Sequence, residues 1–69
     1  MDKHEQFLHY GWEIAEEYSD HVYNSYTRGH YLIMSYGGGD KLIDLDAGQE
    51  IFRGMIYNLP AFMLKFNIN

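Results

Sequence analysis

The sequence contains no cysteine, one proline and no long run of apolar residues. Without cysteine, neither a disulfide framework nor a thiolate zinc site can stabilise the fold, and such a chain suits a reducing compartment. No apolar stretch approaches the ~20 residues of a membrane span, and the N-terminus Met-Asp-Lys-His-Glu lacks the pattern of a signal peptide. We therefore expect a cytoplasmic protein.

Basic residues are also few: five lysines and arginines stand against ten acidic residues, which gives a formal net charge of -5. Free nucleic acid and anionic membranes are poor partners for this charge, whereas a basic protein surface is a good one. Catalytic motifs are missing as well, because Ser19, Ser25 and Ser35 lie in no nucleophile motif. We expect a protein that is not an enzyme and that holds no cofactor.

The chain does contain 46% hydrophobic residues and seven tyrosines among its 69 residues. This length makes a single domain, 1–69, which buries only about 60% of the surface of its unfolded chain. Self-association is the remaining ordinary way to gain stability, so a homodimer is expected. Seven tyrosines cannot all lie in so small a core, and those outside it either form a binding surface or lie half-buried in a sheet.

Local patterns predict two helices and three strands. Asp2 and Glu5 have the spacing of a helix cap, and an apolar stripe that includes Ile14, Tyr18 and Val22 extends a helix to about residue 25. The stretch 30–46 has two apolar runs around a glycine-rich turn and indicates a β-hairpin. Asp46 and Gln49 have a second cap spacing, which predicts a helix that buries Ile51 and ends at Pro60.

Strict alternation over 62–68 then predicts a terminal strand with one buried face. The expected fold is α+β, with two helices packed on a small antiparallel sheet in the order α-β-β-α-β. The sheet has three strands, or four if residues 21–27 are extended instead of helical.

Four carboxylates lie on one side of the first predicted helix, off its apolar stripe. They repel one another at the i,i+3 and i,i+4 positions, and a helix that keeps this repulsion suits a cationic partner, although charged faces also serve solubility alone. Three tyrosines can lie close to them. The predicted partner-binding residues are Glu13, Glu16, Glu17, Asp20, Tyr10, Tyr23 and Tyr26.

These residues favour a non-enzymatic protein-binding module that occupies a basic, nucleic-acid-binding surface of a larger protein. In size, acidity and lack of cysteine, the chain resembles the small inhibitors that phages use against host defences, anti-CRISPR proteins among them. This resemblance implies an inhibitor that acts in the host cytoplasm.

Two alternatives belong to other classes of protein. The first is a small metal- or ligand-binding protein that uses a row of His and Glu side chains at four-residue steps, of which His9, Glu13, Glu17 and His21 are the candidate ligands. Because each step drifts about 40° around a helix, the whole row cannot meet at one ion. The second is a structural subunit whose tyrosines become buried on self-assembly.

Overall fold

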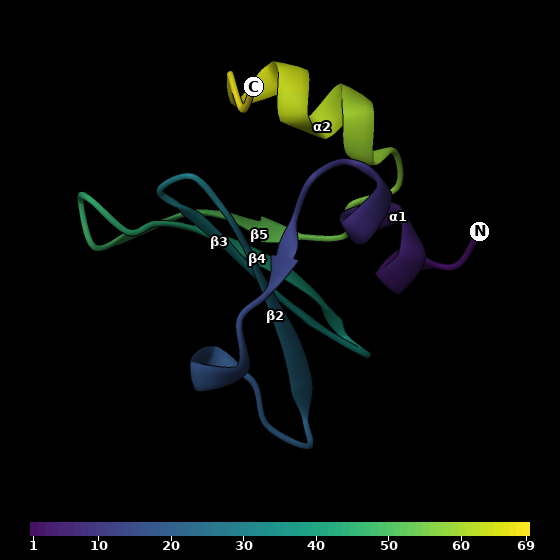
Figure 1. Ribbon diagram of the computed structural model, residues 1–69. Helices are drawn as coiled ribbons and strands as arrows, with labels where there is room; N and C mark the ends of the chain where they lie inside the picture. The colour runs from purple at the N-terminus through teal and green to yellow at the C-terminus, as the bar shows by residue number, and fades with distance from the viewer.

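The computed structural model describes all residues, 1–69, as an α+β domain with two α-helices and a five-stranded antiparallel sheet. Each strand pairs with the strands that precede and follow it in the chain, in the order β1-β2-β3-β4-β5. Both α-helices lie on the same side of the sheet (Figure 1). The elements are α1 (Lys3–His9), β1 (Glu13–Ile14), the 3-10 turn η1 (Glu16–Tyr18), β2 (Tyr23–Arg28), β3 (Tyr31–Tyr36), β4 (Gly39–Asp44), β5 (Gln49–Gly54) and α2 (Leu59–Lys65).

The predicted β-hairpin is confirmed. It consists of β3 and β4, which pair antiparallel from Tyr31 opposite Asp44 to Tyr36 opposite Gly39. Gly37 and Gly38 form the reversal between the two strands. The hairpin lies in the middle of the sheet, because β2 pairs with β3 and β5 pairs with β4.

The first helix begins where the sequence predicts but is much shorter. Asp2 caps α1, since its Oδ1 accepts a hydrogen bond from the Glu5 amide at 2.8 Å. The helix ends at His9 because Gly11 takes a φ of 86°, a backbone conformation that glycine adopts without strain. The amide of Trp12 donates to the Phe7 carbonyl at 2.9 Å, which turns the chain back and brings Trp12 into the core.

Residues predicted to continue that helix are mostly extended. Glu13 and Ile14 form the short edge strand β1, opposite Thr27 and Tyr26 of β2. The extended alternative for 21–27 is therefore the better one, and the expectation of three or four strands is wrong because the sheet has five. Aromatic and β-branched residues fit a pleated sheet well, and here that preference outweighs the helical spacing of the apolar residues.

Both elements predicted after the hairpin have the opposite secondary structure. Where the second helix was expected, β5 pairs with β4, and Ile51 is exposed next to a bulge in that pairing. The spacing of Asp46 and Gln49 is not a helix cap. Instead, Asp44 Oδ1 accepts hydrogen bonds from the amides of Asp46 and Ala47 and so forms the turn between β4 and β5.

The predicted terminal strand is α2. Asn58 caps this helix through a hydrogen bond from the Ala61 amide to Asn58 Oδ1 at 3.1 Å. Pro60 lies in the first turn, where no amide is needed, so it helps to begin a helix instead of ending one. Phe62 and Met63 are buried on one side of α2 while Leu64 is exposed, which is a helical rather than an alternating pattern.

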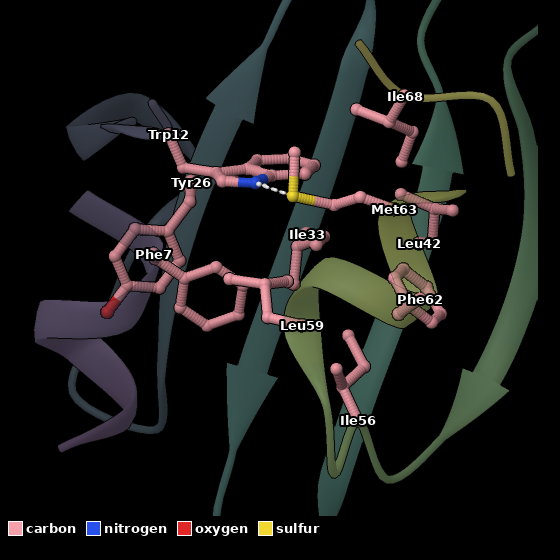
Figure 2. Close-up of a cluster of buried hydrophobic side chains, with 10 residues drawn as sticks. All are labelled: Phe7, Trp12, Tyr26, Ile33, Leu42, Ile56, Leu59, Phe62, Met63 and Ile68. Atoms are coloured by element: carbon pink, nitrogen blue, oxygen red, sulfur yellow. Dashed lines mark hydrogen bonds between the residues drawn. The ribbon is translucent and has the colours of Figure 1, made fainter. Parts of the chain in front are cut away.

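The core lies between the sheet and the two helices (Figure 2). Trp12 is almost fully buried, and its Nε1 donates a hydrogen bond to Met63 Sδ at 3.5 Å. On the other side of Trp12, the Phe7 ring stacks on Tyr26 with a centroid distance of 4.4 Å. The ten residues of the core are Phe7, Trp12, Tyr26, Ile33, Leu42, Ile56, Leu59, Phe62, Met63 and Ile68.

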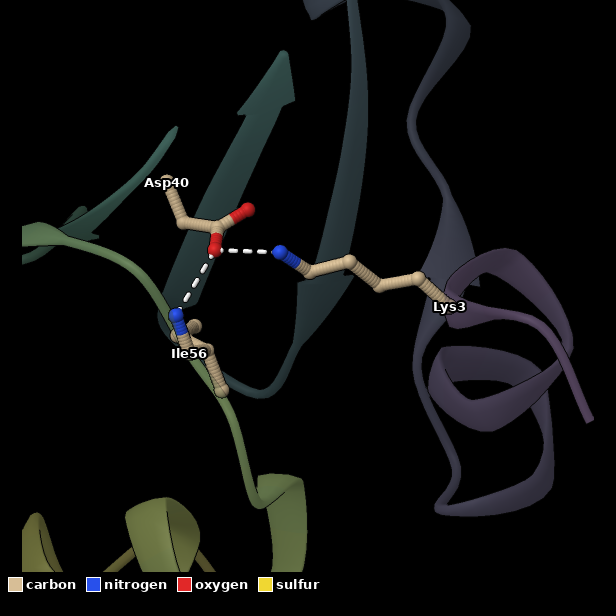
Figure 3. Close-up of polar contacts among 3 residues, drawn as sticks. All are labelled: Lys3, Asp40 and Ile56. Atoms are coloured by element: carbon tan, nitrogen blue, oxygen red, sulfur yellow. Dashed lines mark hydrogen bonds and ion pairs between the residues drawn. The ribbon is translucent and has the colours of Figure 1, made fainter. Parts of the chain in front are cut away.

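A buried carboxylate connects the two ends of the chain to the sheet (Figure 3). Asp40 of β4 is fully buried, and its Oδ2 accepts hydrogen bonds from Lys3 Nζ on α1 and from the Ile56 amide at 2.9 Å. Asp40 Oδ1 has no hydrogen-bond partner. This single side chain therefore fixes both α1 and the segment that leads into α2.

The other side of the sheet is covered by neither α-helix (Figure 1). Alternation along the strands places the neighbours of the core residues on this side. We call it the open face and define it by Tyr23, Met34, Tyr36, Lys41, Ile43 and Arg53, all of them half-buried or exposed. Ser25 and Leu32 lie on the same side but are fully buried, so the β2 side of this face is covered, and the segment that carries η1 is hydrogen-bonded to Ser25 there. Neither helix of the fold has the length and apolar character needed to cross a membrane.

Candidate functional site

The four predicted carboxylates lie along one edge of the sheet, and all four are exposed. We call them the acidic strip: Glu13 of β1, Glu16 and Glu17 of η1, and Asp20 in the loop before β2. The ion pairs of the structure involve Asp40, Asp44 and Glu50, so no basic side chain pairs with the strip. The strip is thus a set of negative charges without ion-pair partners within residues 13–20.

Two serines fasten this part of the chain to the sheet. Ser19 Oγ donates to the Ala15 carbonyl and accepts from the Ser25 amide, both at 2.9 Å. Ser25 is fully buried, and its Oγ donates to the Tyr18 carbonyl at 2.7 Å. Partly buried hydrogen bonds of this kind hold a segment in one position, so η1 is fixed beside β2.

Large apolar side chains are exposed within the same segment. Ile14 is 48% exposed, Tyr18 41% and Val22 62%. Sequence reasoning missed them, because it placed all three on the buried stripe of a long helix. Ile14 and Tyr18 lie between the carboxylates in the chain and Val22 follows Asp20, so the segment combines apolar and acidic side chains, as many protein interfaces do.

The three predicted tyrosines have different environments. Tyr10 is exposed and Tyr23 is half-buried, whereas Tyr26 lies in the core and is not available to a partner. Tyr26 Oη is hydrogen-bonded to His4 Nδ1 at 2.7 Å. Burial raises the pKa of Tyr26 above its ordinary value of 10.0, and the nearby Asp2 carboxylate adds to this effect.

Because its pKa is raised, ionisation of the Tyr26 hydroxyl should lower the stability of the folded protein at alkaline pH. Because the folded protein holds this proton more tightly than the unfolded chain, the contribution to stability is complete below about pH 10 and is lost as the pH rises further. Urea unfolding midpoints at pH 8 and pH 11 test this. The wild-type protein should lose more stability between these pH values than Tyr26→Phe, which has no hydroxyl to titrate. Equal losses would contradict the assignment.

The predicted row of metal ligands is not brought together. His9 ends α1, Glu13 lies in β1, Glu17 in η1 and His21 in the following loop, so no helix carries them on one side.

A different group has the composition of a metal site. Ligand atoms of His30, Asp44 and Asp46 lie within 4.8 Å of one another where the β2–β3 and β4–β5 turns meet. His30 Nε2 and Asp44 Oδ1 are 3.9 Å apart, and His30 and Asp46 are exposed. These residues are where this chain could hold a divalent cation.

The surface has no pocket. No protein-family model, no curated protein and no solved structure matches the chain. The acidic strip and the open face are therefore the two surfaces that distinguish this protein.

Proposed function

We propose that the protein is a non-enzymatic binding module that occupies a basic surface of a larger protein and thereby inhibits it. The observation that carries this proposal is the acidic strip: four exposed carboxylates without ion-pair partners at the sheet edge, with exposed Ile14 and Tyr18 between them and exposed Val22 after Asp20. Carboxylates attract a cationic partner over a distance, and apolar side chains supply contact area once the two surfaces meet.

The partner that fits this surface best is a nucleic-acid-binding site. Proteins that bind nucleic acid place lysine and arginine side chains against its phosphates. The acidic strip offers negative charges to the same side chains, so a bound module excludes nucleic acid by charge and by volume. The inhibitors that the sequence resembles act on such sites, and we place the activity in the cytoplasm.

A displacement assay tests the proposal with defined proteins. The probe is fluorescent double-stranded DNA bound to purified RNA-guided nucleases of CRISPR systems and, for comparison, to a basic DNA-binding protein without sequence preference. We expect the wild-type module to displace DNA from at least one nuclease. Added salt should weaken the displacement, because exposed charges are screened over about 8 Å at physiological ionic strength.

Two variants with equal net charge separate the acidic strip from overall acidity. Glu16→Gln with Glu17→Gln neutralises the strip, and Glu5→Gln with Asp46→Asn neutralises two exposed carboxylates elsewhere. The strip variant should lose about tenfold in affinity or more, which corresponds to about 1.4 kcal/mol, and the matched variant should bind like wild type. Equal weakening of both variants, or no displacement from any nuclease, would overturn the proposal.

A further inference from the structure

The open face combines an apolar centre with a basic side. Met34 pairs with Lys41 across β3 and β4, and Lys41 pairs with Arg53 across β4 and β5, so the three side chains form one row across the sheet. Tyr36 and Ile43 flank this row on the same face, and both are half-buried although no helix covers them. The apolar centre therefore lies at β3 and β4, and the basic side lies toward β5.

The two basic side chains are held in place by their neighbours. Lys41 Nζ lies over the Tyr36 ring, 6.0 Å from its centroid, and has no ion-pair partner. Arg53 makes two hydrogen bonds to Glu50, with Nη2 to Oε1 at 3.0 Å and Nε to Oε2 at 3.1 Å. Lys41 thus has no ion pair of its own. The Arg53 hydrogen bonds have the larger effect in lowering the pKa of the Glu50 carboxyl, and Lys41 lies close enough for its charge to help lower that pKa further.

The η1 part of the acidic strip lies at the opposite, β2 side of the open face, because the Ser25 side chain that bonds η1 belongs to this face. Ser25 of β2 is paired with Met34 of β3. It therefore extends the row formed by Met34, Lys41 and Arg53 across the sheet as far as β2. Ser25 also bonds the segment that carries η1, through its own Oγ to the Tyr18 carbonyl and through its carbonyl to the Ala15 amide. This row therefore has η1, which carries Glu16 and Glu17, at its β2 end, and it has Lys41 and Arg53 at its β4–β5 end.

We propose that the open face is the interface of a homodimer, in which two copies pack face to face around a two-fold axis parallel to the strands. Such an axis reverses the order of the strands, so it places the acidic strip of each copy against Lys41 and Arg53 of the other. The apolar centres of Met34, Tyr36 and Ile43 meet near the axis.

A second copy is the occupant that this charge pattern specifies. A two-fold interface must be complementary to itself, so each side must carry both members of every contact. The open face and the adjoining edge carry both signs of charge at matching positions, on either side of an apolar centre. Because a basic partner and a second copy both use the acidic strip, binding of one excludes the other.

A charge-exchange experiment on the purified protein tests the dimer without reference to any partner. Variant one is Lys41→Glu with Arg53→Glu, and variant two is Glu16→Lys with Glu17→Lys. Each variant alone places like charges together, so we expect each to be monomeric in sedimentation equilibrium up to about 100 μM, while wild type is dimeric at micromolar concentration. Mixed one to one, the variants restore both attractive contacts and should form a heterodimer.

Lys65→Glu changes the charge of an exposed side chain on α2 and should leave the dimer unchanged. Circular dichroism tests whether each variant is folded. If a charge-reversal variant is unfolded, the double variant Lys41→Gln with Arg53→Gln, which removes both positive charges without reversing them, is used instead. This neutral double variant should raise the dissociation constant of the homodimer about tenfold or more. Three results would overturn the inference: a wild type that is monomeric, a charge-reversal variant that is dimeric on its own, or a one-to-one mixture that stays monomeric. Each of them does so whatever the outcome of the DNA-displacement assay.

Discussion

Replacing Trp12 with alanine should unfold the domain under conditions in which wild type is folded. Trp12 is 2% exposed and joins the two halves of the core, since it meets Phe7 edge to face on one side and bonds Met63 of α2 on the other. Truncation of a buried aromatic side chain typically costs about 3–5 kcal/mol. A domain of 69 residues is expected to have only about 3–10 kcal/mol of stability in total.

Thermal unfolding followed by circular dichroism gives the comparison. Tyr57→Ala is the matched aromatic control, because Tyr57 is 89% exposed and should change the midpoint by only a degree or two. Trp12→Phe keeps part of the packing and should fall between the control and Trp12→Ala. A Trp12→Ala variant that melts like the Tyr57→Ala variant would show that the core is not packed as described.

Replacing Asp40 with alanine should destabilise the protein by about 3 kcal/mol or more. Removal of one partner from a buried ion pair typically costs about 3–5 kcal/mol. Lys3 is partly exposed and can turn to water, but the buried Ile56 amide would lose its acceptor, and an unsatisfied buried amide costs about 1–3 kcal/mol by itself. Both α1 and the segment before α2 would loosen together.

A set of variants separates the effect of the Asp40 charge on stability from the effect of the hydrogen bonds that Asp40 accepts. Lys3→Met leaves the Asp40 carboxylate buried without a countercharge and should also be strongly destabilising. Adding Asp40→Asn to Lys3→Met removes that charge and keeps an oxygen for the Ile56 amide, so the double variant should lose less stability than the two single changes added together. Urea unfolding, followed by the fluorescence of the single tryptophan, measures each value. Asp46→Ala is the exposed control, and strict additivity would contradict the proposed role of Asp40.

The sequence alone predicts the structure correctly where a few adjacent residues determine the backbone conformation. The glycine turn at Gly37 and Gly38 identified the hairpin, and Asp2 identified the start of α1, because both depend on a few adjacent residues. The end of α1 depends on Gly11, and the helical spacing of the apolar residues on either side of Gly11 conceals this end in the sequence. The positive φ of Gly11 is favourable because the turn brings Trp12 into the core, and that contact with α2 is far away in the chain.

The second half of the chain shows where periodicity alone fails. Apolar residues spaced for a helix in 49–54 form β5 because β4 offers them a strand to pair with, and alternating residues in 62–68 form α2 because Asn58 and Pro60 begin a helix there. For the candidate site, the acidic residues themselves could be chosen from the sequence. The exposed Ile14, Tyr18 and Val22 could not, because their exposure follows from the early end of α1.

The order of the strands has a consequence for how the chain folds. Because every strand pairs only with its neighbours in sequence, the sheet can form from successive short loop closures, which are fast. The two ends of the chain come together over much longer separations: Lys3 and Asp40 are 37 residues apart, and Trp12 and Met63 are 51 residues apart. During synthesis on the ribosome, the strands can therefore pair before Trp12 can pack against Met63, and the core is completed only after α2 has emerged.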